Sequence, residues 1–347
     1  MPKTTEKKGR GNKKSPLAQG TFGCVYHPGF TCNYKPLSKK YITKIHASDE
    51  LVVQNEIAIS KKIQTIPNYE LYFSPVLENC EVNLAKVERE RVEKCKFIKE
   101  DITNKKSLTY VSTKIRFIEG ESLLDYVEKN PKYSTISFLY KTLCESVKML
   151  AEKEIVHFDL RENNMVVSKQ GIPIIIDFGI SIDFAKLNNR RMKDAFYAFT
   201  TEYKPWCVQI VLIAYLLHRK KSKLTGGQPD EQSVGNEPTQ EGGQPEEQSV
   251  GNEQSVGNEQ SQEGGDATIL SIFDKTTKYL ANKPYLKDAY QKYREKFKNP
   301  ISLKDLLSTY KHWDTYAVSI LLIQMLEKTN QEPDETHVKL LRENLFF

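Results

Sequence analysis

Two short polar segments constrain the fold of this 347-residue chain more than any other feature of its sequence. The first, residues 157–164, reads His-Phe-Asp-Leu-Arg-Glu-Asn-Asn. The second, residues 177–179, reads Asp-Phe-Gly and begins thirteen residues after Asn164, directly behind the apolar run 174–176. A single Asp in a loop is usually a turn or cap residue. Two carboxylates, a carboxamide and a buried strand at this spacing instead predict one shared site.

These residue types fit metal-assisted phosphoryl transfer. That reaction needs a group that accepts the proton of the attacking hydroxyl, and oxygen ligands that hold Mg²⁺ against a triphosphate. Asp159 would be the base, and Asn164 and Asp177 would bind the metal. The metal cofactor implied is Mg²⁺, with Mn²⁺ as an alternative.

The composition suits a globular protein, with 39% hydrophobic residues. No stretch of about eighteen apolar residues occurs, and residues 1–8 lack the apolar core of a signal peptide. We therefore expect a soluble, intracellular protein, cytoplasmic or nuclear, that does not enter a membrane. The six cysteines form no Cys-x-x-Cys pair, which predicts reduced thiols rather than a zinc site or a disulfide framework.

The net charge of +6 is unevenly distributed along the chain. Residues 226–266 contain ten acidic residues and no Lys or Arg, so the rest of the chain carries +16. A body that basic attracts acidic substrates or polyanions. We interpret residues 1–16 as a basic, disordered tail, with nuclear import or polyanion contact as the alternative role. No specific nucleic-acid recognition is predicted.

A repeat interrupts the second half of the chain. Nearly identical twelve-residue units occupy 226–237 and 242–253, and a half-copy follows at 254–259. Segments rich in Gly, Gln and Glu, with Val as their only large apolar residue, cannot bury enough surface to offset chain entropy. We therefore interpret residues 222–267 as a disordered, low-complexity acidic insert, with an interaction tether as the alternative.

Hydrophobic periodicity divides the remaining chain into two parts. Residues 17–118 alternate short β-prone runs, such as 41–45, with one helical stretch at 51–63. From residue 119 onward helical patterns dominate, and the helix expected at 135–151 has one apolar face. This order predicts an α+β fold with a small sheet-rich part and a larger helical part.

The two polar segments resemble the catalytic loop and metal-binding motif of eukaryotic-type protein kinases, His-x-Asp-x-x-x-x-Asn followed by Asp-Phe-Gly. The resemblance implies a bilobal fold, with an N-lobe at 17–118 and a C-lobe at 119–347 that the insert interrupts. It also implies ATP as the phosphoryl donor and a protein as the acceptor. It covers residues 17–206 well and residues 312–326 loosely.

The resemblance extends to the nucleotide-binding half. Residues 17–26 look like the kinase glycine-rich loop, with Ala18 in place of the first glycine; glycines let backbone N–H groups approach phosphate oxygens. Lys44 matches the strand lysine that neutralises the α- and β-phosphates, and Glu56 is its expected partner, with Glu50 as the alternative. The loop residues expected at the nucleotide are Leu17, Gly20, Phe22, Gly23 and Val25.

Residues 114–123 resemble the strand and hinge that receive adenine in this family. By that alignment Ile115 lies at the back of the nucleotide pocket. Arg116, Phe117 and Ile118 would supply the backbone hydrogen bonds of the hinge.

The chain departs from the family at several positions. Phe158 replaces the arginine that binds a phosphate on the activation loop, so we expect no switching by that route. Arg161 replaces a lysine and would offset γ-phosphate charge with a forked guanidinium. Residues 203–206, Tyr-Lys-Pro-Trp, replace Ala-Pro-Glu, a replacement similar to that in divergent kinases of large DNA viruses; a viral chain would act in the host cell or virion. Asp314 either anchors the catalytic loop or is an ordinary first-turn helix aspartate.

We predict an ATP-dependent serine/threonine protein kinase in which Asp159, Lys44 and Arg161 act in catalysis. The preference for Ser and Thr rests on the basic residue two positions after the base. A small-molecule phosphotransferase is the first alternative, and the glycine-rich loop disfavours it. A pseudokinase scaffold that recruits partners through the acidic repeat is the second, and the retained catalytic and metal-binding residues argue against it.

Overall fold

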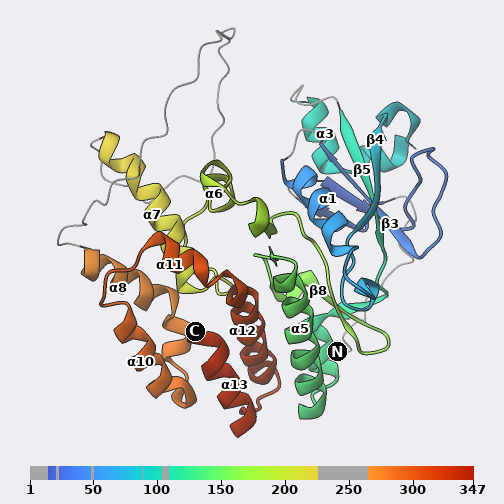
Figure 1. Cartoon of the computed structure of the whole chain (residues 1–347). Helices are drawn as coiled ribbons and strands as arrows, with labels where there is room; N and C mark the ends of the chain where they lie inside the picture. Colours follow the sequence, from blue (N-terminus) through green and yellow to red (C-terminus); the bar gives the residue numbers. More distant parts are fainter. Residues whose placement is uncertain (1–14, 21–22, 48–50, 88, 104–108, 226–264) are drawn as a thin grey trace, which may run out of the picture.

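The structure is a computed structural model that describes residues 15–20, 23–47, 51–87, 89–103, 109–225 and 265–347. The acidic repeats, most of the basic tail, Phe22 and Glu50 lie outside these described residues. Figure 1 shows two parts, a sheet with short helices and a larger helical body. This is the bilobal arrangement expected from the order of strand and helix patterns.

The smaller part is built on one antiparallel sheet of five strands in the order β1-β2-β3-β5-β4. Strands β3 and β5 pair along their full length, with Lys44 opposite Thr113. The strands are β1 (Ala18–Gly20), β2 (Gly23–Tyr26), β3 (Tyr41–Ala47), β4 (Val76–Val82) and β5 (Tyr110–Arg116).

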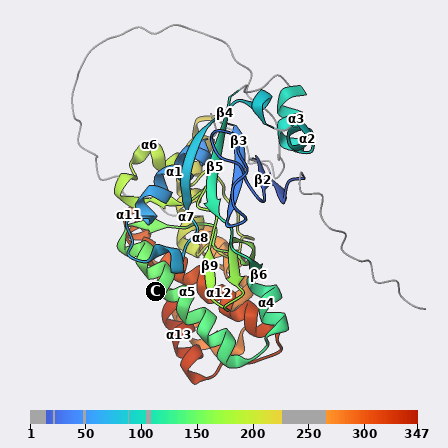
Figure 2. The same cartoon turned by 90° about the vertical axis from the view of Figure 1, so that its right-hand side faces the viewer.

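Helices cover both faces of this sheet. Helix α1 (Leu51–Ile63) packs on the face to which Val111 contributes. Helices α2 (Arg89–Glu93) and α3 (Lys96–Thr103) cover the other face, to which Tyr110 contributes. Successive side chains of a strand point to opposite faces, so these two neighbours join different cores. Figure 2 shows α1 and the α2–α3 pair on opposite sides of the strands.

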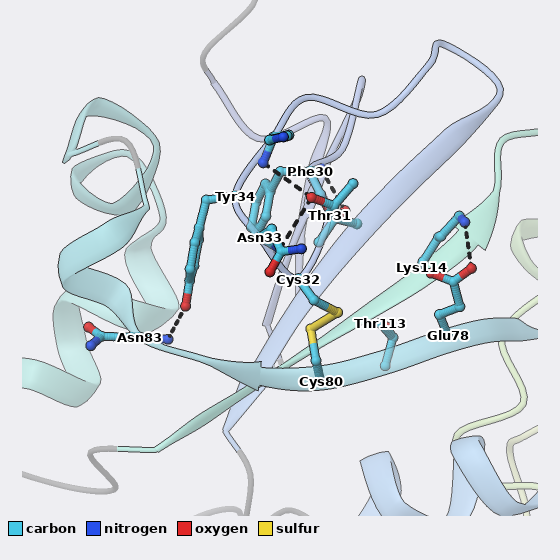
Figure 3. The surroundings of a disulfide bond; sticks show 12 residues. Phe30, Thr31, Cys32, Asn33, Tyr34, Glu78, Cys80, Asn83, Thr113 and Lys114 are labelled. Carbon is cyan, nitrogen blue, oxygen red and sulfur yellow. Dashed lines mark hydrogen bonds and ion pairs between the residues drawn. A yellow bond between two sulfur atoms is a disulfide. The ribbon is translucent and has the colours of Figure 1, made fainter.

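Two disulfides cross-link distant segments of the smaller part. Cys24–Cys95 joins β2 to the start of α3, and Cys32–Cys80 joins the loop after β2 to β4, each with a Cα–Cα distance of 6.0 Å. Figure 3 shows the Cys32–Cys80 bridge. The prediction of reduced thiols is wrong for these four residues. The partners lie 71 and 48 residues apart, so only the folded sheet brings them together and local cysteine spacing carries no sign of it. The other cysteines are free thiols, Cys144 and Cys207.

The larger part surrounds a buried helix, α12 (Trp313–Lys328), whose apolar residues face all directions. A helix that is hydrophobic all round belongs in a protein core. It packs against α5 (Tyr133–Glu152), the helix expected at 135–151, where Tyr140 Oη and Ser319 Oγ share a hydrogen bond of 3.3 Å. Among the residues that the structure describes, no helix is both long and apolar enough to cross a bilayer.

Short elements frame the loops that carry the polar segments. Residues 157–164 lie between β7 and β8, and residues 176–181 lie between β9 and β10. Strand β8 pairs with both β6 and β9, and β7 pairs with β10. These elements are β6 (Gly120–Ser122), α4 (Leu123–Lys129), β7 (Ile155–Val156), β8 (Met165–Ser168), β9 (Pro173–Ile175), β10 (Ile182–Asp183) and α6 (Asn189–Ala195).

Helices on both sides of the insert complete the larger part. Residues 222–225 and 265–267, expected within the insert, are helical, because α7 ends at Thr225 and α8 begins at Gly265. Phe273 of α8 packs on three aromatic rings of α10 and its end, at centroid distances of 4.8–5.7 Å. The remaining helices are α7 (Val208–Thr225), α8 (Gly265–Thr276), α9 (Lys278–Ala281), α10 (Lys287–Lys296), α11 (Leu303–Ser308) and α13 (Glu335–Leu345).

Candidate active site

The loop at 157–164 is anchored by the first turn of α12. Asp314 accepts hydrogen bonds from the backbone N–H groups of His157, at 2.7 Å, and Phe158, at 3.3 Å. Burial raises the pKa of the Asp314 carboxyl, and the nearby His157 and the two N–H groups oppose that shift. Of the two roles open to Asp314 from sequence, the structure has the loop anchor. His157 is itself buried and its Nε2 bonds to the carbonyl of Ile176 at 3.1 Å.

The carboxylate of Asp159 has separate partners on its two oxygens. Asn164 Nδ2 donates to Asp159 Oδ2 and to the Asp159 carbonyl, both at 2.8 Å. The hydroxyl of Tyr203 donates to Oδ1, and Arg161 Nε lies 3.6 Å from that same oxygen. The predicted base, its carboxamide neighbour and the predicted γ-phosphate cation are therefore in contact.

Asp177 is held beside Asn164 through the backbone. The N–H of Ile176 donates to the Asn164 carbonyl at 3.0 Å. Phe178 is buried and packs on the rings of Phe73 and His157, with centroids at 6.2 and 5.0 Å. Asp177 itself has a φ of 66°, a left-handed conformation that non-glycine residues seldom adopt and that clusters at functional sites.

Lys44 joins three elements of the site. Its Nζ lies 3.4 Å from Glu56 Oε2 on α1 and 3.8 Å from Asp177 Oδ1. Glu56 is thus the glutamate that pairs with Lys44, and the alternative, Glu50, lies outside the described residues. Burial by itself lowers the pKa of Lys44, but the two carboxylates outweigh it and hold the pKa above its usual value. Lys44 is therefore a protonated cation beside Asp177. Asn55, the neighbour of Glu56, donates to the carbonyls of Gly179 and Ser181, which fixes α1 against the Asp177 segment.

The glycine-rich segment forms the hairpin of β1 and β2, in which Gly20 pairs with Gly23. Gly23 has a φ of 151°, and a Cβ on it would lie 1.9 Å from the Ile45 carbonyl oxygen. Only glycine can occupy that position without moving β3. The Leu17 N–H donates to the Val25 carbonyl at 2.7 Å, which closes the base of the hairpin.

The structure distinguishes among the three predicted hinge residues. The Arg116 carbonyl accepts a hydrogen bond from Ser74 Oγ at 2.9 Å, and its guanidinium donates to the Phe73 carbonyl at 3.2 Å. The Phe117 N–H donates to the Lys40 carbonyl at 2.8 Å. Across the described residues, the backbone N–H and carbonyl of Ile118 have no hydrogen-bond partner. Arg116 is therefore engaged in hydrogen bonds within the protein, whereas Ile118 has backbone groups open to a ligand.

An aromatic cluster beside Asp159 was not expected from the sequence. The Trp206 indole donates to the Phe158 carbonyl at 2.8 Å, and the two rings pack at 4.9 Å. Tyr203 stands edge-on against Trp206 at 5.2 Å. Phe158 therefore packs in a buried cluster where the family has a phosphate-binding arginine. The Tyr-Lys-Pro-Trp segment departs from the family sequence, but its sequence alone does not indicate that the Tyr203 hydroxyl contacts Asp159.

Asn164 and Asp177 present the oxygen ligands that Mg²⁺ prefers. Asn164 uses Nδ2 for both of its bonds to Asp159, so Oδ1 has no partner within the described ranges. Asp177 is 49% exposed. No cluster of three or more His, Cys, Asp or Glu in the described part of the chain could hold a metal alone. The donor set therefore fits Mg²⁺, which takes few protein ligands and completes its shell with phosphate oxygens and water.

The smaller part is a five-stranded sheet with α1 on one face, and it is joined to a helical body. Lys44, Asp159 and Asp177 lie where the two parts meet. This arrangement is that of the protein kinase fold. Residues 12–205 match the family described as Protein kinase domain, and the chain belongs to that family.

Three similar proteins are fungal kinases. Serine/threonine-protein kinase CLA4 of Saccharomyces cerevisiae is 29% identical over 90 residues, which are 23% of this chain and 10% of that protein. Serine/threonine-protein kinase SKM1 of the same yeast is 24% identical over 88 residues, 22% of this chain and 13% of its own length. CLA4 of Eremothecium gossypii is 30% identical over 90 residues, 23% of this chain and 11% of that protein. The chain thus matches only a small part of the length of these relatives.

Proposed function

We propose that the chain is an ATP- and Mg²⁺-dependent protein kinase that transfers the γ-phosphoryl group to Ser and Thr hydroxyls of protein substrates. The observation that carries the proposal is the position of Lys44 Nζ, 3.4 Å from Glu56 and 3.8 Å from Asp177. One protonated lysine thereby links the strand expected at the phosphates to the segment expected at the metal. That is the arrangement in which a lysine neutralises phosphate charge during transfer.

Each residue of the loop would have a separate task. Asp159 would accept the proton of the substrate hydroxyl through Oδ1, because Asn164 already occupies Oδ2. Asn164 Oδ1 and Asp177 would hold Mg²⁺, which when bound neutralises the charge that develops on the phosphate oxygens. Arg161, beside Asp159, would offset the charge of the γ-phosphate.

The nucleotide would lie between an N-lobe at 17–118 and a C-lobe at 119–347. Backbone N–H groups of the hairpin at 17–25 would cover the phosphates, since Gly20 and Gly23 present no Cβ there. Ile118 would bond adenine through its unpartnered backbone groups, with Arg116 supporting the hinge from Ser74 and Phe73.

The choice of Ser and Thr is supported by Arg161, two residues after the base, and by the three serine/threonine kinases that the chain resembles. Similarity to kinases of large DNA viruses stays a prediction from residues 203–206. Polyanion contact through residues 1–16 stays a prediction as well.

The test is transfer of labelled phosphate from ATP to casein or myelin basic protein. We expect Asp159→Asn and Asp177→Ala to lose activity by about a hundredfold or more, and EDTA to abolish transfer in the wild type. Asp159→Asn should still bind nucleotide, since the proposed role of Asp159 is to accept a proton and not to hold phosphate or metal. Asp288→Asn, at an exposed position of α10, is the matched control.

The two alternatives predict different results in the same assay. A pseudokinase scaffold would bind ATP while the wild type and both variants transfer nothing. A small-molecule phosphotransferase would label small alcohols and aminoglycosides but no protein. Either result would overturn the proposed function.

A further inference from the structure

The hydroxyl of Tyr203 occupies the atom that a substrate hydroxyl needs. It donates to Asp159 Oδ1, while Asn164 Nδ2 occupies Oδ2 at 2.8 Å. A hydroxyl that attacks the γ-phosphate must give its proton to a base within hydrogen-bond reach. Oδ1 is the Asp159 oxygen that Asn164 leaves free, and a hydroxyl of this same chain already lies there.

The aromatic cluster holds Tyr203 in that place. Tyr203 packs edge-on against Trp206, and Trp206 is fixed by its hydrogen bond to the Phe158 carbonyl and by packing on the Phe158 ring. Phe158 is the residue before Asp159, so one buried cluster positions both the base and the phenol. Burial, and next the Asp159 carboxylate, raise the pKa of Tyr203, so the phenol is neutral and keeps its proton until a base removes it.

The residues between α6 and α7 leave Tyr203 as the hydroxyl in contact with the base. Residues 196–207 form neither helix nor strand. The hydroxyls of Thr200 and Thr201 lie in the same stretch, but of the described hydroxyls there only that of Tyr203 donates to Asp159. The first acceptor offered to this site is therefore a tyrosine supplied in cis.

We propose that Tyr203 is a phosphorylation site of this chain, modified intramolecularly by its own Asp159 site. The inference rests on the proposed kinase function and adds an activity to it, a single tyrosine phosphorylation in cis beside Ser and Thr phosphorylation in trans. Tyr203 reaches the base because it is built into the site, so the acceptor class for free substrates need not include tyrosine.

The step balances with ATP as the only co-reactant. The Tyr203 Oη forms a bond to the γ-phosphorus, and the bond between that phosphorus and the β–γ bridging oxygen breaks. ADP leaves with the electron pair of the broken bond, and the phenolic proton passes to Asp159 Oδ1. Tyr203 has a single hydroxyl, so each chain accepts one phosphate here. The phosphotyrosine then carries a charge of about −1.5 to −2, which the Asp159 carboxylate repels.

The experiment uses the full chain, first dephosphorylated with a phosphatase and then incubated with ATP and Mg²⁺. Phosphorylated residues are mapped by mass spectrometry, and the first-order rate is measured over a hundredfold range of enzyme concentration. We expect close to one phosphate per chain on Tyr203, at a rate that does not depend on enzyme concentration. Tyr203→Phe should lose this phosphotyrosine. Tyr197→Phe, at a tyrosine that is 58% exposed in the same segment, should keep it within about twofold.

A mixing experiment tests the intramolecular route. A Lys44→Met chain carrying a mass tag retains Tyr203 and Asp159, and we expect it to stay unmodified at Tyr203 when mixed with active wild type. Phosphate on the tagged chain, or a rate proportional to enzyme concentration, would overturn the cis route. Phosphate confined to Thr200 or Thr201, or casein labelled while Tyr203 is not, would overturn the site and leave the proposed function standing. Absence of transfer to both casein and Tyr203 would overturn both.

Discussion

Reduction of the two disulfides should destabilise the sheet-containing part of the molecule and leave the helical part much less affected. The bridges are nested, because Cys32–Cys80 lies within the loop that Cys24–Cys95 closes. In the chain-entropy description, closing a loop of 48 residues stabilises the folded state by about 4.1 kcal/mol. With that bridge present, the outer bridge closes only the difference between separations of 71 and 48, about 23 residues, worth about 3.4 kcal/mol.

The two bridges together therefore contribute about 7.5 kcal/mol at most, which is comparable to the whole stability of a typical domain. With a urea m-value of about 3 kcal/mol per molar, loss of the outer bridge alone should lower the unfolding midpoint of the sheet part by about 1 M. A larger cost is expected when both are reduced. Measured contributions of disulfides often fall below the entropic figure, so these values set the upper end.

Regional probes can separate the two parts. Hydrogen exchange of peptides from β2 to β5 should accelerate strongly in a non-thiol reductant. Tryptophan fluorescence should respond less, because Trp206 and Trp313 both lie in the helical part. A Cys24→Ala/Cys95→Ala variant should respond less to the reductant than the wild type. Cys144→Ala, which removes a free thiol, should respond like the wild type. Unchanged exchange in the reduced protein, or alkylation of Cys24 before reduction, would refute the reasoning.

Two further predictions follow from single contacts, and a third concerns the acidic insert. Asp314→Ala should lower the free energy of unfolding by about 2–4 kcal/mol in urea titration, because two buried N–H groups lose a charged acceptor; an effect no larger than that of the exposed Asp288→Ala would contradict the anchor. Glu56→Gln should weaken ADP binding about tenfold by calorimetry, since its lysine partner loses a buried carboxylate, whereas Glu128→Gln should not. Replacing residues 226–264 by a short Gly-Ser linker should keep kinase activity within about threefold, because loop length costs little free energy. Lost activity in a folded variant would count against the interpretation of this segment as a disordered insert.

Local sequence carries a large share of the fold. Strand β3 and helices α1 and α5 follow from runs and periodicity of apolar residues, because burial of one face depends on nearby spacing alone. The pairing of Lys44 with Glu56 was predicted from the resemblance to protein kinases, and the two side chains lie 3.4 Å apart. The assignment of roles to Asp159, Asn164 and Asp177 stays a prediction, which the kinase family membership of the chain supports.

Contacts between distant segments could not be predicted in the same way. Asp314 lies 157 residues from His157. The sequence did not distinguish a role in anchoring the loop from that of an ordinary first-turn helix aspartate, because the distance between the two segments depends on the fold. In the predicted hinge, Arg116 and Phe117 form hydrogen bonds with Ser74 and Lys40, which are distant in sequence. Among the described residues, these bonds leave Ile118 as the hinge residue whose backbone groups have no partner. A backbone group gives no sign in the sequence of whether it is already bonded.

The sequence by itself determined which chemical groups this protein has, in what order, and that they fit phosphoryl transfer. Only the tertiary structure decided that four cysteines form disulfides and that the Tyr203 hydroxyl lies on Asp159. The physical reason is that a disulfide or a hydrogen bond depends on a separation of a few ångströms in space. Separation along the chain fixes that distance within one helix or hairpin, and leaves it free between elements that meet only after folding.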